Sequence, residues 1–69
     1  MQTEMEIADT RLTLYELQVE HRDLDLVIEH LALNPMPDEL LVRRLKKRKL
    51  LLKDRIDQLE QILVPDILA

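Results

Sequence analysis

The sequence contains no glycine, cysteine, tryptophan or phenylalanine, and it also lacks serine. Without cysteine the chain has neither a disulfide framework nor a thiolate metal site. Without glycine it lacks the usual loops that cradle phosphate groups. Serine and cysteine nucleophiles are absent, and the threonines lie beside no histidine. We therefore expect no enzyme: no catalytic residue, no cofactor, no metal and no small-molecule substrate.

Long apolar runs are absent as well. The longest are short clusters such as Leu50 to Leu52, whereas a helix needs about 20 apolar residues to cross a bilayer. The first residues, MQTEMEIADTR, are acidic and no apolar segment follows them, which argues against a signal peptide. These features predict a cytoplasmic protein without a membrane partner.

Three prolines are the only strong breaks in the chain. Good helix formers occupy residues 4–33, and Thr3 and Glu6 have the spacing of a capping box. Residues 34–37, Asn-Pro-Met-Pro, predict a turn, because a residue before proline is disfavoured in a helix. Pro37 suits the first position of a second helix over 37–63, which Pro65 ends, leaving 64–69 as a tail. We therefore predict an all-α, antiparallel two-helix hairpin, forming a single domain over residues 1–69.

Two apolar stripes run along the first predicted helix on roughly opposite faces. The first stripe has the alternating three-and-four spacing of heptad core positions, with Thr10 completing it: Ile7, Leu14, Leu17, His21, Leu24, Ile28 and Leu31. The second stripe contains Met5, Ala8, Leu12, Tyr15, Val19, Leu26 and Leu33. One stripe is expected to pack on the second helix of the same chain, and the other requires a different chain. The assignment of the two stripes can be exchanged on this evidence.

The second predicted helix has one main stripe, which a lysine interrupts: Val42, Leu45, Lys49, Leu52, Ile56, Leu59 and Leu63. The hairpin is expected to be held by apolar residues from both helices: Leu14, Leu17, Leu24, Ile28, Leu45, Leu52, Ile56 and Leu59. At 69 residues, a hairpin without disulfides or metal usually needs oligomerisation. We therefore expect self-association into a coiled-coil-like four-helix bundle or a higher oligomer, as a dimer or tetramer.

The charge is distributed unevenly along the chain. Residues 1–34 carry eight acidic residues and two arginines, whereas residues 35–69 carry six acidic residues and eight lysines or arginines. The positive charge is concentrated in one basic run: Arg43, Arg44, Lys46, Lys47, Arg48 and Lys49. In an antiparallel hairpin this run lies beside the acidic segment from Glu20 to Glu29. We expect the two segments to neutralise each other in part.

Two blocks of the sequence resemble a known family. Glu20-His21-Arg22-Asp23-Leu24-Asp25, a short gap with prolines, and then Leu45 to Asp54 (LKKRKLLLKD) are similar to the YdcH-like family of small bacterial proteins. The similarity extends from Glu20 to about Gln58 and does not include residues 1–19. It implies a bacterial helical hairpin. The function of that family is unknown, so the resemblance assigns no activity.

The two histidines are nine residues apart and fall on nearly opposite faces of one helix, so they cannot share a metal within it. His21 is interpreted as a core-position histidine bonded to Asp25 or to water rather than as a metal ligand. A polar group at such a position can fix register or oligomeric state.

The leading functional hypothesis is a structural or adaptor protein that binds itself or another helical protein. Its partner interface would be formed by Leu12, Tyr15, Val19 and Leu26. The alternative is nucleic-acid binding through the basic run from Arg43 to Lys49. Against this alternative, a helix spreads these residues around its circumference, and Tyr15 is the only aromatic residue available for base stacking.

Overall fold

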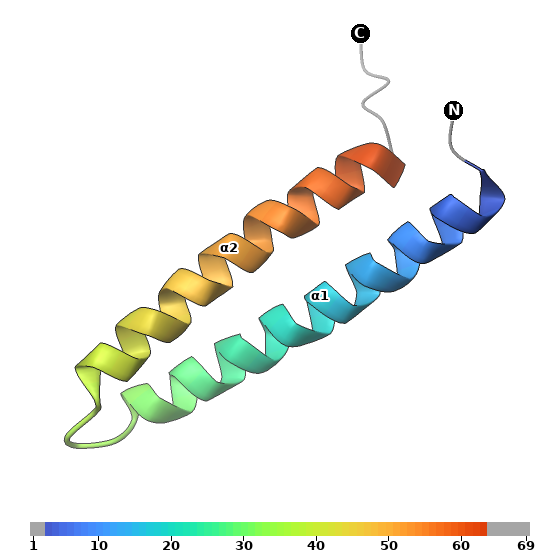
Figure 1. Cartoon of the computed structure of the whole chain (residues 1–69). Helices are drawn as coiled ribbons and strands as arrows, with labels where there is room; N and C mark the ends of the chain where they lie inside the picture. The colour runs from blue at the N-terminus through green and yellow to red at the C-terminus, as the bar shows by residue number, and fades with distance from the viewer. Residues whose placement is uncertain (1–2, 64–69) are drawn as a thin grey trace, which may run out of the picture.

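The chain folds into two antiparallel helices, as seen in a computed structural model that describes residues 3–63. Helix α1 comprises Glu4–Ala32 and helix α2 comprises Glu39–Leu63. The two helices pack side by side along their length, and a short turn joins them at one end (Figure 1). This arrangement confirms the predicted all-α hairpin. Self-association stays a prediction, because a single chain is present.

The start of α1 is fixed by the predicted capping box. The Thr3 hydroxyl accepts a hydrogen bond from the backbone N–H of Glu6 at 3.1 Å, and the Glu6 carboxylate accepts one from the backbone N–H of Thr3 at 3.4 Å. These bonds satisfy two backbone donors at the end of the helix. Glu4 and Glu6 also place negative charge in the first turn, where the helix dipole favours it.

The turn departs from the predicted boundaries. Helix α1 ends at Ala32, with Leu33 as its C-cap. The side-chain oxygen of Asn34 then accepts a hydrogen bond from the backbone N–H of Met36 at 3.1 Å, which closes a tight turn at the first proline.

The prediction that Pro37 occupies the first position of the second helix is wrong, because α2 begins at Glu39. Asp38 precedes it as the capping residue. Its carboxylate accepts from the backbone N–H of Leu41 at 3.0 Å, and its carbonyl accepts from that of Val42 at 3.0 Å. An aspartate cap satisfies a free donor of the first turn, which a proline at the first helical position does not. The predicted tail at 64–69, with Pro65, lies outside the described residues.

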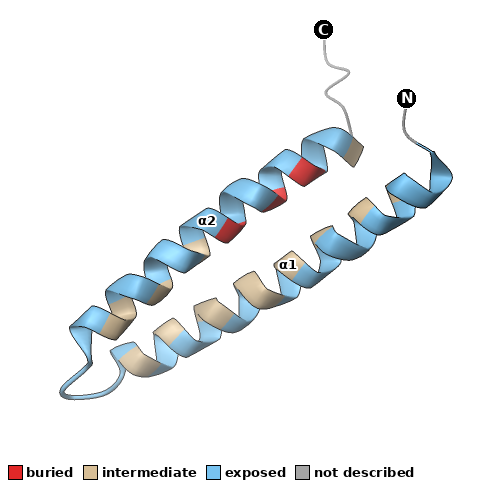
Figure 2. Ribbon diagram, in the orientation of Figure 1, coloured by how far each residue is buried: buried red, intermediate tan, exposed pale blue. Residues whose placement is uncertain are grey.

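The apolar core is small and lies toward the open end of the hairpin. Leu52, Ile56 and Leu59 are only 4–5% exposed, and they are the buried residues of the described part of the chain. All three lie on the side of α2 that faces α1 (Figure 2). The facing residues of α1 are half-buried: Ile7, Leu14, Leu17, His21, Leu24, Ile28 and Leu31. The first stripe of the sequence, called the inner stripe below, is therefore the one that packs within the hairpin.

The molecule is long and only one helix layer thick. Its principal extents are 51 × 28 × 15 Å, and its radius of gyration is 15.8 Å. A compact domain of this length has a radius of gyration of about 11 Å. A single layer buries one side of each helix and leaves the opposite side in contact with solvent. In this geometry α2 has three buried residues and α1 has none.

Candidate protein-interaction surface

The second apolar stripe of α1, called the outer stripe below, is exposed along its whole length. The exposed fractions are 57% for Leu12, 64% for Tyr15, 41% for Val19 and 55% for Leu26. Met5 and Leu33 extend it toward the two ends of the helix and are also exposed. These residues therefore form an apolar strip that the chain itself does not cover and that Arg22 and Glu29 interrupt in its second half.

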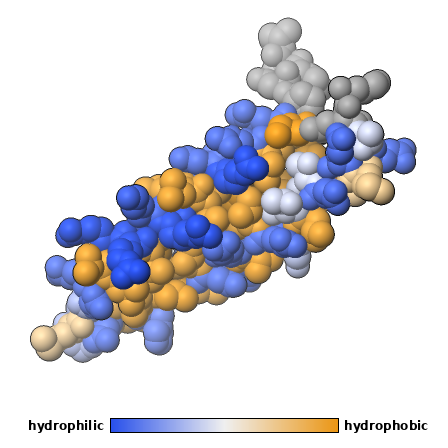
Figure 3. Space-filling view, viewed as in Figure 1, coloured by the Kyte–Doolittle hydropathy of each residue, from blue (hydrophilic) through white to orange (hydrophobic). Residues whose placement is uncertain are grey.

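The outer stripe lies on the side of α1 that faces away from α2. Its residues lie about half a turn around the helix axis from those of the inner stripe. Each residue adds about 100° of rotation, and the spacing of the two sets puts them on opposite faces. Apolar residues also reach the surface on the face drawn in Figure 3, where they lie between hydrophilic residues. Unlike scattered surface leucines, large apolar residues that recur along one exposed face of a helix indicate an interaction site.

The basic run of α2 divides into two parts. Arg48 and Lys49 turn toward α1. One guanidinium nitrogen of Arg48 lies 2.8 Å from a carboxylate oxygen of Glu20, with a second bond of 3.2 Å from the Arg48 Nε. The Lys49 ammonium pairs with the Asp25 carboxylate. The predicted neutralisation between the helices is thus confirmed for two of the six basic residues.

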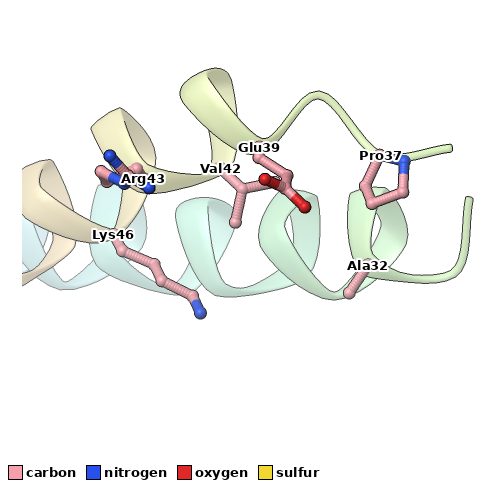
Figure 4. Close-up of a pocket in the computed structure, with 6 residues that line it drawn as sticks. All are labelled: Ala32, Pro37, Glu39, Val42, Arg43 and Lys46. Atoms are coloured by element: carbon pink, nitrogen blue, oxygen red, sulfur yellow. The ribbon is translucent and has the colours of Figure 1, made fainter.

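The remaining basic residues are Arg43, Arg44, Lys46 and Lys47. All four are exposed, and none forms an ion pair with another of the described residues. Arg43 and Lys46 line an open hollow of about 420 Å³ beside the turn. Figure 4 shows their side chains on α2 with Glu39 and Val42, while Ala32 comes from the end of α1 and Pro37 from the turn.

A polar layer crosses the hairpin near its middle. His21 lies in the inner stripe with its side chain 23% exposed, and its Nδ1 is 3.9 Å from a carboxylate oxygen of Asp25. That distance is too long for a hydrogen bond. Lys49 occupies the position that interrupts the apolar stripe of α2 and binds the same carboxylate. The hydrogen bond from Lys49, aided by the positive charge of Lys49 and to a smaller extent by nearby His21, lowers the pKa of Asp25 despite its partial desolvation.

The chain was compared with family models, curated proteins and solved structures. A family model described as "Protein of unknown function (DUF465)" matches residues 14–60, about two thirds of the chain. The chain belongs to this family. The DUF465 match includes both sequence blocks quoted above, and it begins at Leu14, six residues before the resemblance that starts at Glu20. It therefore takes in most of the inner stripe of α1 and, with Tyr15, Val19 and Leu26, much of the outer stripe.

The DUF465 family description assigns no activity to its members. No curated protein and no solved structure matches the chain at a significant level. Neither helix in residues 3–63 is long and apolar enough to cross a membrane. In the same part of the chain no three His, Asp or Glu side chains are grouped so that they could hold a metal ion.

Proposed function

We propose that this DUF465 protein, which resembles the YdcH-like proteins, is a non-enzymatic structural or adaptor module that acts by helix–helix binding to protein. The observation that carries the proposal is the exposed outer stripe of α1. It contains large apolar residues at helical spacing that stay 41–64% exposed in the hairpin. Ordinary surface helices carry charged or polar residues on the side that faces solvent. The stripe is therefore explained by a partner helix that covers it.

The side chains of the outer stripe suit this role. Leu12, Val19 and Leu26 supply apolar area, and Tyr15 adds an aromatic ring with a polar tip, the type of residue that is enriched at interfaces. Charged and polar residues border the stripe and give it a polar rim, among them Asp9, Glu16, Arg11 and Gln18. The composition argues against an enzymatic role, because it lacks serine and cysteine nucleophiles.

The proposal is tested with a matched pair of double variants. Leu12→Gln/Leu26→Gln alters the outer stripe, while Leu40→Gln/Leu51→Gln alters leucines of α2 that are at least as exposed. Sedimentation equilibrium over a range of concentrations measures self-association, and recovery of bound proteins by the immobilised chain measures association with others. We expect only the α1 variant to lose binding. Equal binding by the wild type and the α1 variant in both measurements would contradict the proposal.

The second candidate is nucleic-acid binding, and the four exposed cations favour it. Arg43, Arg44, Lys46 and Lys47 form no ion pair with the described acidic residues, so they are available to phosphate groups. The test is a gel-shift assay at low salt that compares Arg43→Gln/Lys47→Gln with Lys53→Gln/Arg55→Gln, which removes the same charge elsewhere on α2. A salt-sensitive shift that only the first variant weakens would support this function. No shift at low salt would exclude it.

A further inference from the structure

One border of the outer stripe carries charge of a single sign. Three carboxylates recur there every seven residues, and they are called the acidic edge below: Asp9, Glu16 and Asp23. A seven-residue repeat keeps side chains on one edge of a helix, about 10 Å apart. All three are exposed, and none forms an ion pair with another described residue. The next position of the row is His30, in the last turn of α1.

The rest of the surface around the stripe carries both signs. Its polar residues lie on the opposite border or interrupt the stripe: Glu4, Arg11, Gln18, Arg22, Asp25 and Glu29. Lys49 of α2 neutralises Asp25 within the hairpin. The two arginines and the two glutamates that remain cancel in net charge. The acidic edge therefore gives the surface its net charge, which is negative.

A parallel second copy of α1 does not suit this surface. In a parallel pair in register, each stripe position faces its own copy. Arg22 would then meet Arg22, and Glu29 would meet Glu29. Between the borders of the two copies, the attraction of Arg11 to Glu16 is offset by a contact of two carboxylates at the start of the helix. Like charges thus oppose each other both within the stripe and beside it.

An antiparallel second copy does not suit it either. In an antiparallel pair like borders meet, so the acidic edge of one copy would lie against the acidic edge of the other. Opposed carboxylates repel. On the other border Arg11 meets Asp25 in some registers, but that carboxylate is already held by Lys49.

The outward residues of α2 do not supply a matching helix. The helix contains the basic run, but its exposed apolar residues occur in pairs of positions that are ten or eleven residues apart: Leu40, Leu50, Leu51 and Ile62. Positions of the outer stripe are three or four residues apart. Most of the stripe would therefore face charged or polar side chains of α2. The helix that covers the stripe comes from another protein.

We propose that the outer stripe binds an amphipathic helix of a different protein, whose apolar row is bordered by lysine or arginine residues that face the acidic edge. The inference rests on the proposed function and adds to it the chemical class of the partner. The apolar contact extends from Met5 to Val19, a length of roughly 20 Å or about four helical turns. Charged residues beside the apolar row of a paired helix determine which partner is accepted.

Two synthetic peptides test the charge requirement on the full chain. Each is an amphipathic helix about three heptads long with leucine at the core positions. One has lysine along a single border of its leucine row, and the other has glutamate at the same positions. Fluorescence anisotropy of the labelled peptides measures their dissociation constants. We expect the lysine peptide to bind about tenfold more tightly or better, and this preference to shrink as salt is raised. Equal affinities, or no binding of the lysine peptide, would overturn the inference.

Matched charge reversals locate the contact on α1. Asp9→Lys/Glu16→Lys alters the acidic edge, and Asp54→Lys/Glu60→Lys changes the net charge equally at exposed positions of α2. The first variant is expected to bind the lysine peptide about tenfold more weakly and the glutamate peptide more tightly than the wild type does. A variant that had failed to fold would not gain affinity for the second peptide. The α2 variant is expected to stay within about twofold of the wild type. Equal effects of both variants would show unspecific attraction and overturn the inference.

The outer-stripe variant Leu12→Gln/Leu26→Gln separates this inference from the proposed function. If it abolishes peptide binding while Asp9→Lys/Glu16→Lys binds both peptides as the wild type does, the proposed function stands and the inference is wrong. Self-association of the wild type that the outer-stripe variant abolishes would identify a second copy as the partner, with the same consequence. If the outer-stripe variant changes neither peptide binding nor self-association, both are wrong.

Discussion

Lys49 of α2 forms an ion pair with Asp25 of α1 across the middle of the hairpin. Both side chains lie at the edge of the apolar contact, where a leucine at position 49 would have continued the stripe of α2. An ion pair between two helices forms in one alignment only, whereas apolar stripes can slide by a heptad. With the neighbouring Arg48–Glu20 pair, it selects the register in which the buried residues of α2 meet the inner stripe.

The ion pair predicts an acid-sensitive component of stability. Because the hydrogen bond from Lys49 lowers the pKa of Asp25 below its ordinary value of 3.8, the unfolded chain takes up a proton at a higher pH than the folded chain does. The stabilisation is therefore present above the unfolded pKa and is lost as the pH falls through the lowered folded pKa. Urea unfolding between about pH 2 and 6 is expected to show a shallower acid decline for Asp25→Asn than for the wild type.

Asp23→Asn is the matched control for this measurement, because Asp23 lies two residues away and forms no ion pair with another described residue. Its acid decline is expected to follow that of the wild type. If Asp25→Asn and Asp23→Asn decline in parallel, then the Lys49 bond does not stabilise the folded chain.

The small core predicts a large difference between two adjacent leucines. Leu52 is buried against α1, whereas Leu51 points into solvent. Removing buried methyl groups costs transfer free energy and leaves a cavity, so Leu52→Ala is expected to lower the free energy of unfolding by about 2–5 kcal/mol. Leu51→Ala is expected to change it by no more than about 0.5 kcal/mol. Urea unfolding followed by circular dichroism measures both, and similar losses would contradict the observed face of α2.

His21 predicts a stabilising substitution. It is a polar residue in the inner stripe, between Leu17 and Leu24, and it forms no hydrogen bond among the described residues. His21→Leu extends the apolar contact and is expected to raise the free energy of unfolding by about 1 kcal/mol. A change of that size raises the melting temperature of a domain of this size by about 4–8 °C. His30 is exposed on the same helix, so His30→Leu is the control and is expected to leave the melting temperature unchanged. A lower melting temperature for His21→Leu would show that its polar ring is required.

The helical period and the proline positions were sufficient to predict the hairpin, because few structures other than two packed helices accommodate such stripes without glycine. They were insufficient to choose between the stripes of α1. Leu14 and Leu12 have the same side chain and similar neighbours, and only the position of α2 distinguishes inside from outside. The start of α2 was misplaced for a local reason. Pro37 fits a first helical turn, but the Asp38 carboxylate accepts a hydrogen bond from the backbone N–H of Leu41, and the helix begins after Asp38. The role of the outer stripe depends on a partner, which one chain does not contain.

The Asp38 cap gives the last prediction, and it separates the observed start of α2 from the predicted one. Asp38→Ala removes the acceptor for the Leu41 backbone N–H and is expected to cost about 1 kcal/mol of stability. Asp38→Asn keeps an acceptor oxygen and caps nearly as well, so it is expected to retain most of the stability in thermal unfolding followed by circular dichroism. If the helix began at Pro37, residue 38 would lie inside the first turn and would act mainly through its negative charge on the helix dipole. Asparagine and alanine would then be equally destabilising, because both remove that charge.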